Sequence, residues 1–407
     1  MSQPYTAFTF PNGQTVKNRI VKAAMEENLS DPQLQPSDTL IQLYRTWSAG
    51  GTGLLLTGNV MVDARAMTGP GGVALEKDTP LERFSIWAKA AQANDTKVWM
   101  QINHPGRQVY ANMNGVVYAP SAIKVDLGKL SKLFGEPEAM TETQIEDVIT
   151  RFGDTAVNAQ HSGFNGVQIH AAHGYLLAQF LSPLVNQRTD QWGGDLVNRA
   201  RLLMRIVDEI KARTAPNFAV SVKLNSADFQ RGGFDEIDAL GVVQMLEQKG
   251  IDLVELSGGS YEAPAMQGMT KDGRTLAREA YFLAFAKTIA QQTTLPIMTT
   301  GGITQLKTAQ QVLADGVQLV GLATALAMRP DLPNHWQNAP AYQAPKPQVS
   351  WRNKSLQALA VMAMIKRNLQ RIGRGKAPKV FMSPVLSLIK DQLRKAKLTK
   401  RYNKRQR

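Results

Sequence analysis

Residues 166–175 read GVQIHAAHGY, a short buried-looking run that closes on two histidines and a tyrosine. Runs of this kind are typical of a strand in a parallel sheet, where the carboxyl end carries the chemistry. A longer segment, Thr141–Ser162, precedes the run and has apolar residues at the three- and four-residue spacing of a helix. Its opening, Thr141-Glu-Thr-Gln144, predicts a capping box. The unit is therefore a helix followed by a strand.

The same unit recurs along the chain. There are seven further short apolar or β-branched runs: Arg19–Ala24, Gly53–Val62, Val98–His104, Ala219–Asn225, Asp252–Gly258, Pro296–Gly302 and Val317–Ala323. Eight strands alternating with helices predict an α/β fold of the (β/α)8 TIM-barrel type. A doubly wound sheet is the alternative, but it seldom needs eight equivalent units. Phe8–Val16, with Asn-Gly at its centre, predicts an N-terminal β-hairpin that closes the bottom of the barrel.

Composition excludes several classes of protein. The 407 residues are 43% hydrophobic and 20% charged, which fits a globular chain with a sizeable core. No run of eighteen apolar residues predicts a membrane span, and the first residues do not resemble a secretory signal. The absence of cysteine excludes disulfides, thiolate nucleophiles and cysteine-ligated metal sites, and we predict no metal centre. A reducing cytoplasm is the expected location.

The net charge of +14 belongs to one end of the chain. Residues 351–407 hold 17 of the 47 Lys and Arg residues and one of the 33 acidic residues, Asp391. The rest of the chain is therefore nearly neutral. We predict a barrel domain over residues 1–340 and a basic, partly helical C-terminal extension over 341–407.

Two helical segments are predicted in this extension, Ser355–Ile372 and Val380–Leu398. We expect the first to pack on the barrel or on a second subunit, and the basic run Arg394–Arg407 to be a solvated, partly disordered end. The alternative for this end is reversible attachment to an anionic membrane surface. Nucleic acid is disfavoured because Tyr402 is the run's one aromatic residue on which a base could stack.

The motif after residue 169 carries the candidate chemistry. An isolated histidine is more often a packed side chain than a catalytic one. Here two of the chain's five histidines, His170 and His173, lie within six residues of each other and of Tyr175. Two imidazole donors can hold a carbonyl or nitro oxygen and draw electron density from the adjacent double bond. A nearby phenol is suited to proton donation.

From His170 to Gly194 the sequence HAAHGYLLAQFLSPLVNQRTDQWGG resembles the old yellow enzyme family of FMN-dependent NAD(P)H oxidoreductases, or ene-reductases. The resemblance continues, in the family's order, at Asn18-Arg19, Ala23–Met25, Gln101–Arg107, Asn198-Arg199, Arg201, Asn225–Asp228 and Thr300–Ile303. It covers roughly residues 5–335. A barrel alone would not have indicated a function.

The resemblance implies that FMN lies across the barrel mouth, with NADH or NADPH as reductant. Gln101 would bond the pyrimidine edge, His170 would contact both flavin and substrate oxygen, and Lys223 would stabilise the anionic reduced ring. Gly301 and Gly302 would let the backbone approach the phosphate. The full implied set is Ala23, Ala24, Met25, Glu26, Asn59, Gln101, His170, Lys223, Gly301, Gly302, Ala323 and Thr324.

Two positions depart from the family pattern. Ala323-Thr324 stands where the family usually carries Gly-Arg, which predicts weaker phosphate binding unless another cation compensates. Glu26 stands where relatives place Thr or Cys. An ionised carboxylate there would oppose flavin reduction, so Glu26 turns away, stays protonated, or lowers the flavin potential.

Three functions follow. The first is an ene-reductase that acts on α,β-unsaturated carbonyl-type substrates, with His170 and His173 polarising the oxygen and Tyr175 supplying the proton. The second is a flavin reductase of the same fold acting on quinones, nitro compounds or a dienoyl thioester. The third is a non-catalytic flavin barrel whose tail binds membrane or nucleic acid, which the intact His-His-Tyr motif disfavours.

Overall fold

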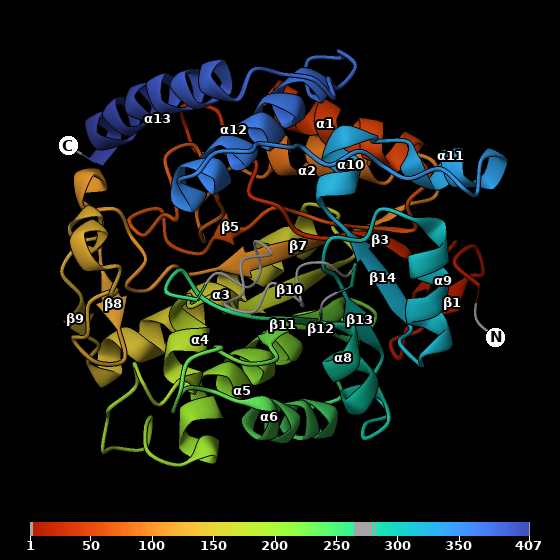
Figure 1. Ribbon diagram of the computed structural model, residues 1–407. Coiled ribbons are helices and arrows are strands. Elements are labelled where there is room, and N and C mark those ends of the chain that lie inside the picture. Colours follow the sequence, from red (N-terminus) through yellow and green to blue (C-terminus); the bar gives the residue numbers. More distant parts are fainter. Residues whose placement is uncertain (1–2, 264–278, 281, 407) are drawn as a thin grey trace.

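The computed structural model describes residues 3–263, 279–280 and 282–406 (Figure 1). Its centre is a closed ring of eight parallel strands: β3 (Ile20–Lys22), β4 (Leu54–Leu56), β7 (Lys97–Asn103), β10 (Gly166–Ala171), β11 (Ala219–Asn225), β12 (Leu253–Ser257), β13 (Ile297–Thr299) and β14 (Leu319–Leu322). The pairing of β10 with β7 closes the ring. Seven of these strands lie within their predicted runs, and β7 begins one residue before its run, Val98–His104. The (β/α)8 barrel is thus confirmed, and the doubly wound sheet is excluded because the ring has no open edge.

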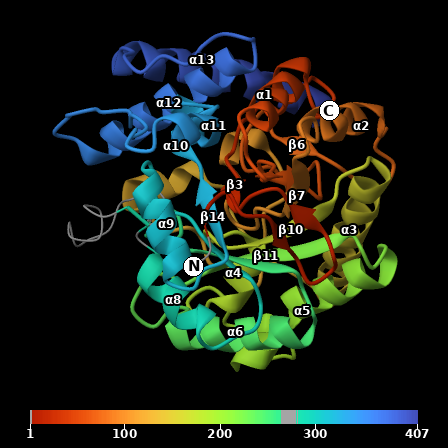
Figure 2. The same cartoon turned by 90° about the vertical axis from the view of Figure 1, so that its right-hand side faces the viewer.

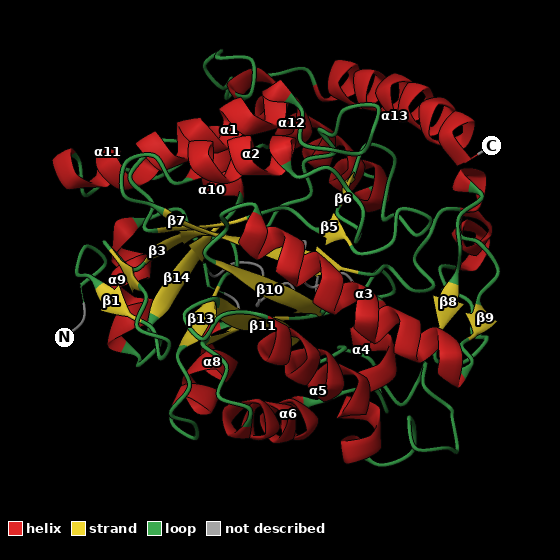
Figure 3. Ribbon diagram, turned by 180° about the vertical axis from the view of Figure 1, so that it is seen from behind, coloured by secondary structure: helices red, strands yellow, loops and turns green. Residues whose placement is uncertain are grey.

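Helices surround this ring, as Figure 3 shows. They are α1 (Asp38–Ala49), α2 (Glu82–Ala91), α3 (Glu142–His161), α4 (Leu176–Leu181), α5 (Leu196–Arg213), α6 (Glu236–Gln248), α8 (Leu283–Ala290), α9 (Leu306–Ala314), α10 (Thr324–Met328) and α11 (Leu332–Asn338). The predicted capping box opens α3, where the Thr141 hydroxyl and the Gln144 side chain each bond the other residue's backbone N–H. Short elements occupy the loops after β4 and β7: β5 (Val60–Met61), β6 (Val73–Ala74), η1 (Ala111–Met113), β8 (Tyr118–Ala119), η2 (Gly128–Leu133) and β9 (Glu138–Ala139).

An N-terminal hairpin covers the bottom of the barrel, as predicted. It consists of β1 (Phe8–Thr9) and β2 (Thr15–Val16). The Phe10 ring packs 4.7 Å from the Trp99 ring inside the barrel, and both belong to the inner apolar cluster. The backbone N–H of Asn12 donates to Asp252 at 3.0 Å. Apolar packing and this hydrogen bond together hold the hairpin across the opening.

A buried ion pair joins the barrel to α1. Lys22 at the end of β3 is fully buried, and its Nζ lies 3.2 Å from Glu27 Oε1. The same Nζ donates to the Leu56 carbonyl at 2.8 Å and to Tyr44 Oη at 3.0 Å. Tyr44 Oη donates to Glu27 at 2.6 Å. Every polar group of this cluster therefore has a partner, which a buried charge requires.

The C-terminal extension folds onto the barrel. It forms α12 (Lys354–Ile372) and α13 (Pro384–Gln406), which lie together over α1 and α10 (Figure 2). α12 contacts α1 and α10, and α13 contacts α12 and η1. We expected the first helix of the extension to pack on the barrel or on a second subunit. The structure shows that α12 packs on the barrel. No helix in the described ranges is long and apolar enough to cross a membrane.

The expectation of a solvated, partly disordered end is wrong for residues 394–406. α13 continues to Gln406, and the Tyr402 side chain is buried with its hydroxyl donating to the Ala64 carbonyl at 2.8 Å. Arg394 donates to the Asn28 carbonyl at 2.7 Å, and Arg401 donates to the Asp31 carbonyl at 3.0 Å. Loop carbonyls at the barrel mouth thus satisfy two arginines of a run, residues 394–406, that contains no acidic residue.

Replacing Lys22 tests how far the barrel depends on its buried charge. Lys22→Met leaves the buried Glu27 carboxylate without its cationic partner, so we expect the free energy of unfolding to fall by about 3–5 kcal/mol. Urea unfolding measures this change. Lys77→Met, an exposed lysine with no ion pair in the described structure, should change stability by less than about 0.5 kcal/mol. Equal effects would show that the buried pair does not carry this stability.

Candidate active site

A chain of hydrogen bonds crosses the inside of the barrel. Gln101 on β7 donates to Gln168 on β10 at 2.8 Å, and Gln168 donates to Glu255 on β12 at 2.9 Å. Lys223 on β11 completes the chain with a 2.8 Å ion pair to Glu255. The strand register sets these contacts, because Gln101 is paired with Gln168, and Lys223 with Glu255. All four side chains are buried.

Two of these four residues, Gln168 and Glu255, were missed in the sequence. The signal was present, because polar residues recur at every second position of the strands: Gln168 and His170 on β10, Ser221 and Lys223 on β11, Glu255 and Ser257 on β12. Such alternation places all of them on one face of the sheet.

The predicted His-His-Tyr cluster forms at the end of β10. The ring centres of His170 and His173 lie 4.9 Å apart, and the Tyr175 ring lies 4.9 Å from His170. His170 Nδ1 accepts the N–H of Ala172 at 3.2 Å, so the neutral ring carries its proton on Nε2. His173 has a left-handed backbone, with a φ of 61°, and its N–H donates to Asn225 Oδ1 at 3.0 Å. That bond holds the turn that brings both imidazoles together.

Both imidazoles are held neutral. Burial lowers the pKa of His170 well below its ordinary value, and neighbouring His173 and Lys223 lower it further. Burial and Lys223 have the same effect on the pKa of His173, whose Nε2 lies 2.8 Å from Ser257 Oγ. Neutral imidazoles can donate one hydrogen bond each to a substrate oxygen without carrying charge.

Tyr175 is paired with a second tyrosine. Its hydroxyl lies 3.0 Å from that of Tyr261, a residue that the sequence did not single out. Burial is the main cause that raises the pKa of both phenols, so both keep their protons at neutral pH. The pair can pass a proton from one hydroxyl to the other while one of them faces a ligand.

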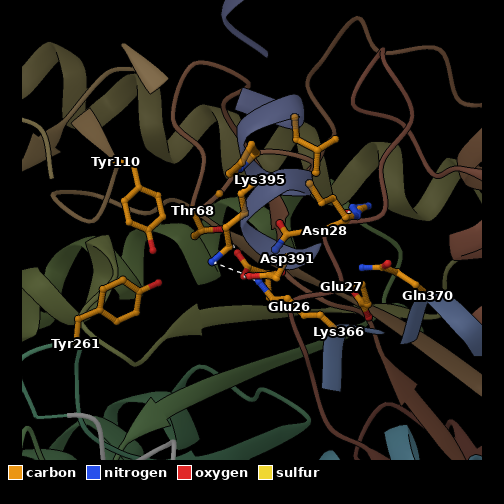
Figure 4. A pocket seen from close by; sticks show the side chains of 14 residues that line it. Glu26, Glu27, Asn28, Thr68, Tyr110, Tyr261, Lys366, Gln370, Asp391 and Lys395 are labelled. Carbon is orange, nitrogen blue, oxygen red and sulfur yellow. Dashed lines mark hydrogen bonds and ion pairs between the residues drawn. The ribbon is translucent and has the colours of Figure 1, made fainter. Parts of the chain in front are cut away.

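The Glu26 carboxylate is bonded to two polar side chains. Thr68 Oγ1 donates to its carboxylate at 2.8 Å, Asn59 donates to Thr68 at 3.3 Å, and Lys366 of α12 lies 3.3 Å from the second carboxylate oxygen. Burial alone would raise the pKa of Glu26, but Lys366 and Thr68 outweigh it and the pKa lies below the ordinary value. Glu26 is therefore ionised, which excludes the protonated alternative. Figure 4 shows Glu26 with Thr68 and Lys366.

The remaining predicted residues follow the ends of three barrel strands. Ala23, Ala24 and Met25 come directly after β3, and the Ala23 N–H donates to the Leu322 carbonyl of β14 at 2.9 Å. Gly301 and Gly302 come after β13 with φ values of 130° and 68°. These conformations favour glycine strongly. Ala323 stands between β14 and α10, and Thr324 is the first residue of α10.

The long loop after β7 reaches the same mouth. Arg107 at its start forms a 2.6 Å ion pair with Glu262, and Tyr110 stacks on Phe134 further along the loop. Phe134 in turn contacts the Tyr261 ring. The loop therefore packs against the tyrosine pair, so the mouth is bounded by residues that lie far apart in sequence.

Comparison with known proteins agrees with this geometry. The model of the NADH:flavin oxidoreductase / NADH oxidase family matches residues 5–341. An NADH-dependent flavin oxidoreductase from Hypocrea jecorina is 33% identical over 383 residues, which cover 86% of this chain and 94% of that protein. One from Neonectria sp. is 35% identical over 350 residues, covering 80% of this chain but 46% of the relative, so this chain spans about half of that protein's length.

Among solved structures, the old yellow enzyme homologue from Zymomonas mobilis has a TM-score of 0.72 at 22% identity. The match covers 84% of this chain and 94% of that one. At this identity the likeness supports the fold.

The donor set at the mouth fits a flavin. The Gln101 amide can both donate and accept, as a pyrimidine edge requires, and Lys223 offers a cation fixed by Glu255. His170 and His173 supply two further donors, and the glycines after β13 expose backbone. When bound, FMN would supply hydride chemistry at the mouth of this barrel.

A third imidazole at the mouth generates a pH prediction. His104 is buried, and burial lowers its pKa to about 4. An unfolded chain takes up this proton near pH 6.5, so stability present at pH 7 is lost as the pH falls toward 4. We expect His104 alone to cost about 2 kcal/mol of unfolding free energy between pH 7 and pH 5.

Urea unfolding of wild type and His104→Asn at the two pH values measures that share. Asn can still accept the Gly106 N–H that His104 Nδ1 accepts at 3.1 Å. The variant should lose less stability on acidification. A drop equal to that of the wild type would show that His104 is protonated in the folded protein at pH 5.

Proposed function

Because the chain belongs to the NADH:flavin oxidoreductase / NADH oxidase family, that of the old yellow enzymes, we propose that it is an FMN-dependent ene-reductase. It would take electrons from NADH or NADPH and reduce the activated C=C bond of α,β-unsaturated carbonyl-type compounds. The observation that supports this most directly is the pair of neutral imidazoles beside a protonated tyrosine. That set can polarise an oxygen and protonate a carbon without a metal ion.

The roles follow from the geometry. His170 and His173 donate to the substrate oxygen, which withdraws electrons from the conjugated double bond. A hydride then adds to the β-carbon, and Tyr175 gives a proton to the α-carbon, so the alkene gains two hydrogens. Tyr261 is placed to return a proton to Tyr175. Burial of the cluster excludes water and strengthens each of these hydrogen bonds.

We assign the flavin contacts as the resemblance implies. Gln101 takes the pyrimidine edge and Lys223 the side of the ring that becomes negative on reduction. The segment Ala23–Glu26 and Asn59 take further contacts to the ring, with Glu26 beside a flavin carbonyl. Gly301, Gly302, Ala323 and Thr324 take the phosphate, where a hydroxyl replaces the family's arginine and weaker binding of FMN is expected.

The acceptor is the open part of this proposal. Quinones, nitro compounds and dienoyl thioesters also present an oxygen next to a reducible group, and the same imidazoles would bind them. A screen of such oxidants against the reduced enzyme, with NADH and NADPH compared as reductants, identifies the class. A purified protein whose bound flavin is not bleached by NADH or NADPH would instead favour the non-catalytic flavin barrel.

The Tyr175→Phe variant tests the catalytic assignment. Proton donation belongs only to the second half-reaction, so bleaching of the flavin by nicotinamide should be nearly unchanged. Reoxidation by an enone should slow by about 10²–10⁴-fold. Anaerobic stopped-flow absorbance follows both half-reactions. Tyr342→Phe, on the α11 side of the barrel, is the matched control, and equal slowing of both halves in Tyr175→Phe would reject the role as proton donor.

We propose further that the C-terminal extension attaches the enzyme reversibly to anionic membranes from the cytoplasmic side. The outer face of α13 leaves apolar side chains in solvent: Val385, Leu386, Ile389 and Leu393, with Phe381 before the helix 93% exposed. A cavity of about 210 Å³ beside them is lined by five cations and one acid: Arg367, Arg371, Arg374, Lys376, Lys390 and Asp391, with Gln370. None of these five cations has an ion pair among the described residues.

Exposed apolar residues next to uncompensated cations suit a headgroup surface, where each cation contributes about 1 kcal/mol. We expect Ile389→Asp/Leu393→Asp to abolish cosedimentation with anionic vesicles at low salt. Ile237→Asp, at a still more exposed position on α6, should not. If neutral vesicles bound the protein as well as anionic ones, the proposed attraction between the cations and anionic headgroups would be wrong. Dimerisation that Ile389→Asp/Leu393→Asp disrupts, without vesicle binding, would assign the face to a second copy of the chain.

A further inference from the structure

The ion pair between Glu26 and Lys366 joins two segments that lie 340 positions apart. Glu26 follows the first barrel strand, within the part of the chain that matches the family. Lys366 lies on α12, beyond residue 341, where that match ends. The Lys366 side chain is 12% exposed and that of Glu26 is 29% exposed. The C-terminal extension thus places a cation beside Glu26, a residue that the resemblance assigns to the flavin site.

α12 holds Lys366 in a fixed place. On either side of it, Ile365 and Leu369 belong to the main apolar core. The fully buried Asn368 accepts the N–H of Lys379 at 2.9 Å and donates to its carbonyl at 3.0 Å. These bonds tie the helix to the segment that leads into α13. The backbone of Lys366 is therefore held at a fixed place relative to the segment that carries Glu26.

The pair also lines a small cavity at the mouth. Its volume is about 50 Å³, and its walls include Tyr110 and Tyr261 from the barrel loops and Arg394 and Lys395 from α13. Figure 4 shows the two tyrosines facing the Glu26 cluster across this space. Tyr261 is the partner of Tyr175, so the extension bounds the same mouth that holds the proposed proton donor.

We propose that Lys366 is a positioning residue of the flavin site, which holds the Glu26 carboxylate ionised, oriented toward Thr68 and compensated in charge. This inference rests on the proposed function, because the contact between Glu26 and the flavin comes from the family resemblance. A bare carboxylate beside the ring would repel the electron-rich carbonyl edge and oppose reduction. A fixed ammonium removes most of that repulsion.

The electrostatics of Glu26 agree with this role. Burial would raise its pKa, and Lys366 is the largest of the opposing causes that bring the pKa below the ordinary value. With Lys366 gone, the balance shifts toward burial, so the pKa of Glu26 should rise into the range where FMN binding is measured. A titration that the wild type lacks would then appear.

The test is FMN affinity as a function of pH in the Lys366→Met variant, measured by quenching of FMN fluorescence. We expect the wild type to show no titration of Glu26 between pH 5.5 and pH 9. In Lys366→Met, affinity should fall by about tenfold across this range as Glu26 ionises. The flavin midpoint potential at pH 8 should fall in the same variant. Lys366→Arg should restore both properties.

A double-mutant cycle separates positioning from other effects. If Lys366 acts through Glu26, Lys366→Met should change nothing further in the Glu26→Gln background. An equal effect in both backgrounds would overturn the proposal, because Lys366 would then act directly or through folding alone. Lys395→Met, which removes a cation of the same cavity that pairs with Asp391, is the matched control and should show no new titration.

The apoprotein gives a readout that needs no cofactor. Because the pKa of Glu26 is lowered in the fold, the pair stabilises the protein at neutral pH and this contribution is lost as the pH falls through that pKa. Lys366→Met should lower the midpoint of thermal unfolding at pH 8, and the cycle with Glu26→Gln should show the coupling. A wild type that binds no FMN but shows this coupling would reject the proposed function and leave the pairing intact. Absence of coupling would reject the pairing itself.

Discussion

The closure of the ring between β7 and β10 is the constraint on which the site depends. Trp99–Ile102 pair in parallel with Gly166–Ile169, and this register sets Gln101 opposite Gln168. On the next strands the same ring sets His170 opposite Lys223, and Lys223 opposite Glu255. A slip of one residue at any of these pairings would turn the polar side chains out of the barrel. Backbone hydrogen bonding between the strands therefore decides which side chains meet at the mouth.

Three lysines of the molecule form ion pairs with glutamates. Lys22 pairs with Glu27 behind the barrel wall, Lys223 with Glu255 inside it, and Lys366 with Glu26 at its rim. Buried pairs of this kind contribute little net stability because desolvation offsets their attraction, but they fix the position of both partners. In each pair the carboxylate and the ammonium group therefore fix one another's position.

The basic extension divides its charge between two faces. On the inner face, Lys366 pairs with a carboxylate, while Arg394 and Arg401 donate to loop carbonyls at the mouth. On the outer face, Arg374, Lys376 and Lys390 line an open cavity without an acidic partner other than Asp391, which pairs with Lys395. One segment thus contributes to the wall of the candidate site and to a cationic surface. Its excess of charge does not by itself indicate a nucleic-acid partner.

The sequence by itself determined the barrel, its hairpin, and the His170, His173 and Tyr175 cluster, because each depends on local signals: strand-helix alternation, an Asn-Gly turn and residues within one short motif. The polar period on β10 and β12 was also readable, although Gln168 and Glu255 were overlooked. The partner of Glu26 was not readable, nor was the pairing of Tyr175 with Tyr261, since no local pattern links residues 26 and 366 or 175 and 261. The ordered end of α13 was not readable for the same reason, because its arginines donate to carbonyls of residues 28–31, far away in sequence. Contacts between distant segments follow from how the closed barrel and the docked helices share one surface, and only the tertiary structure decides them.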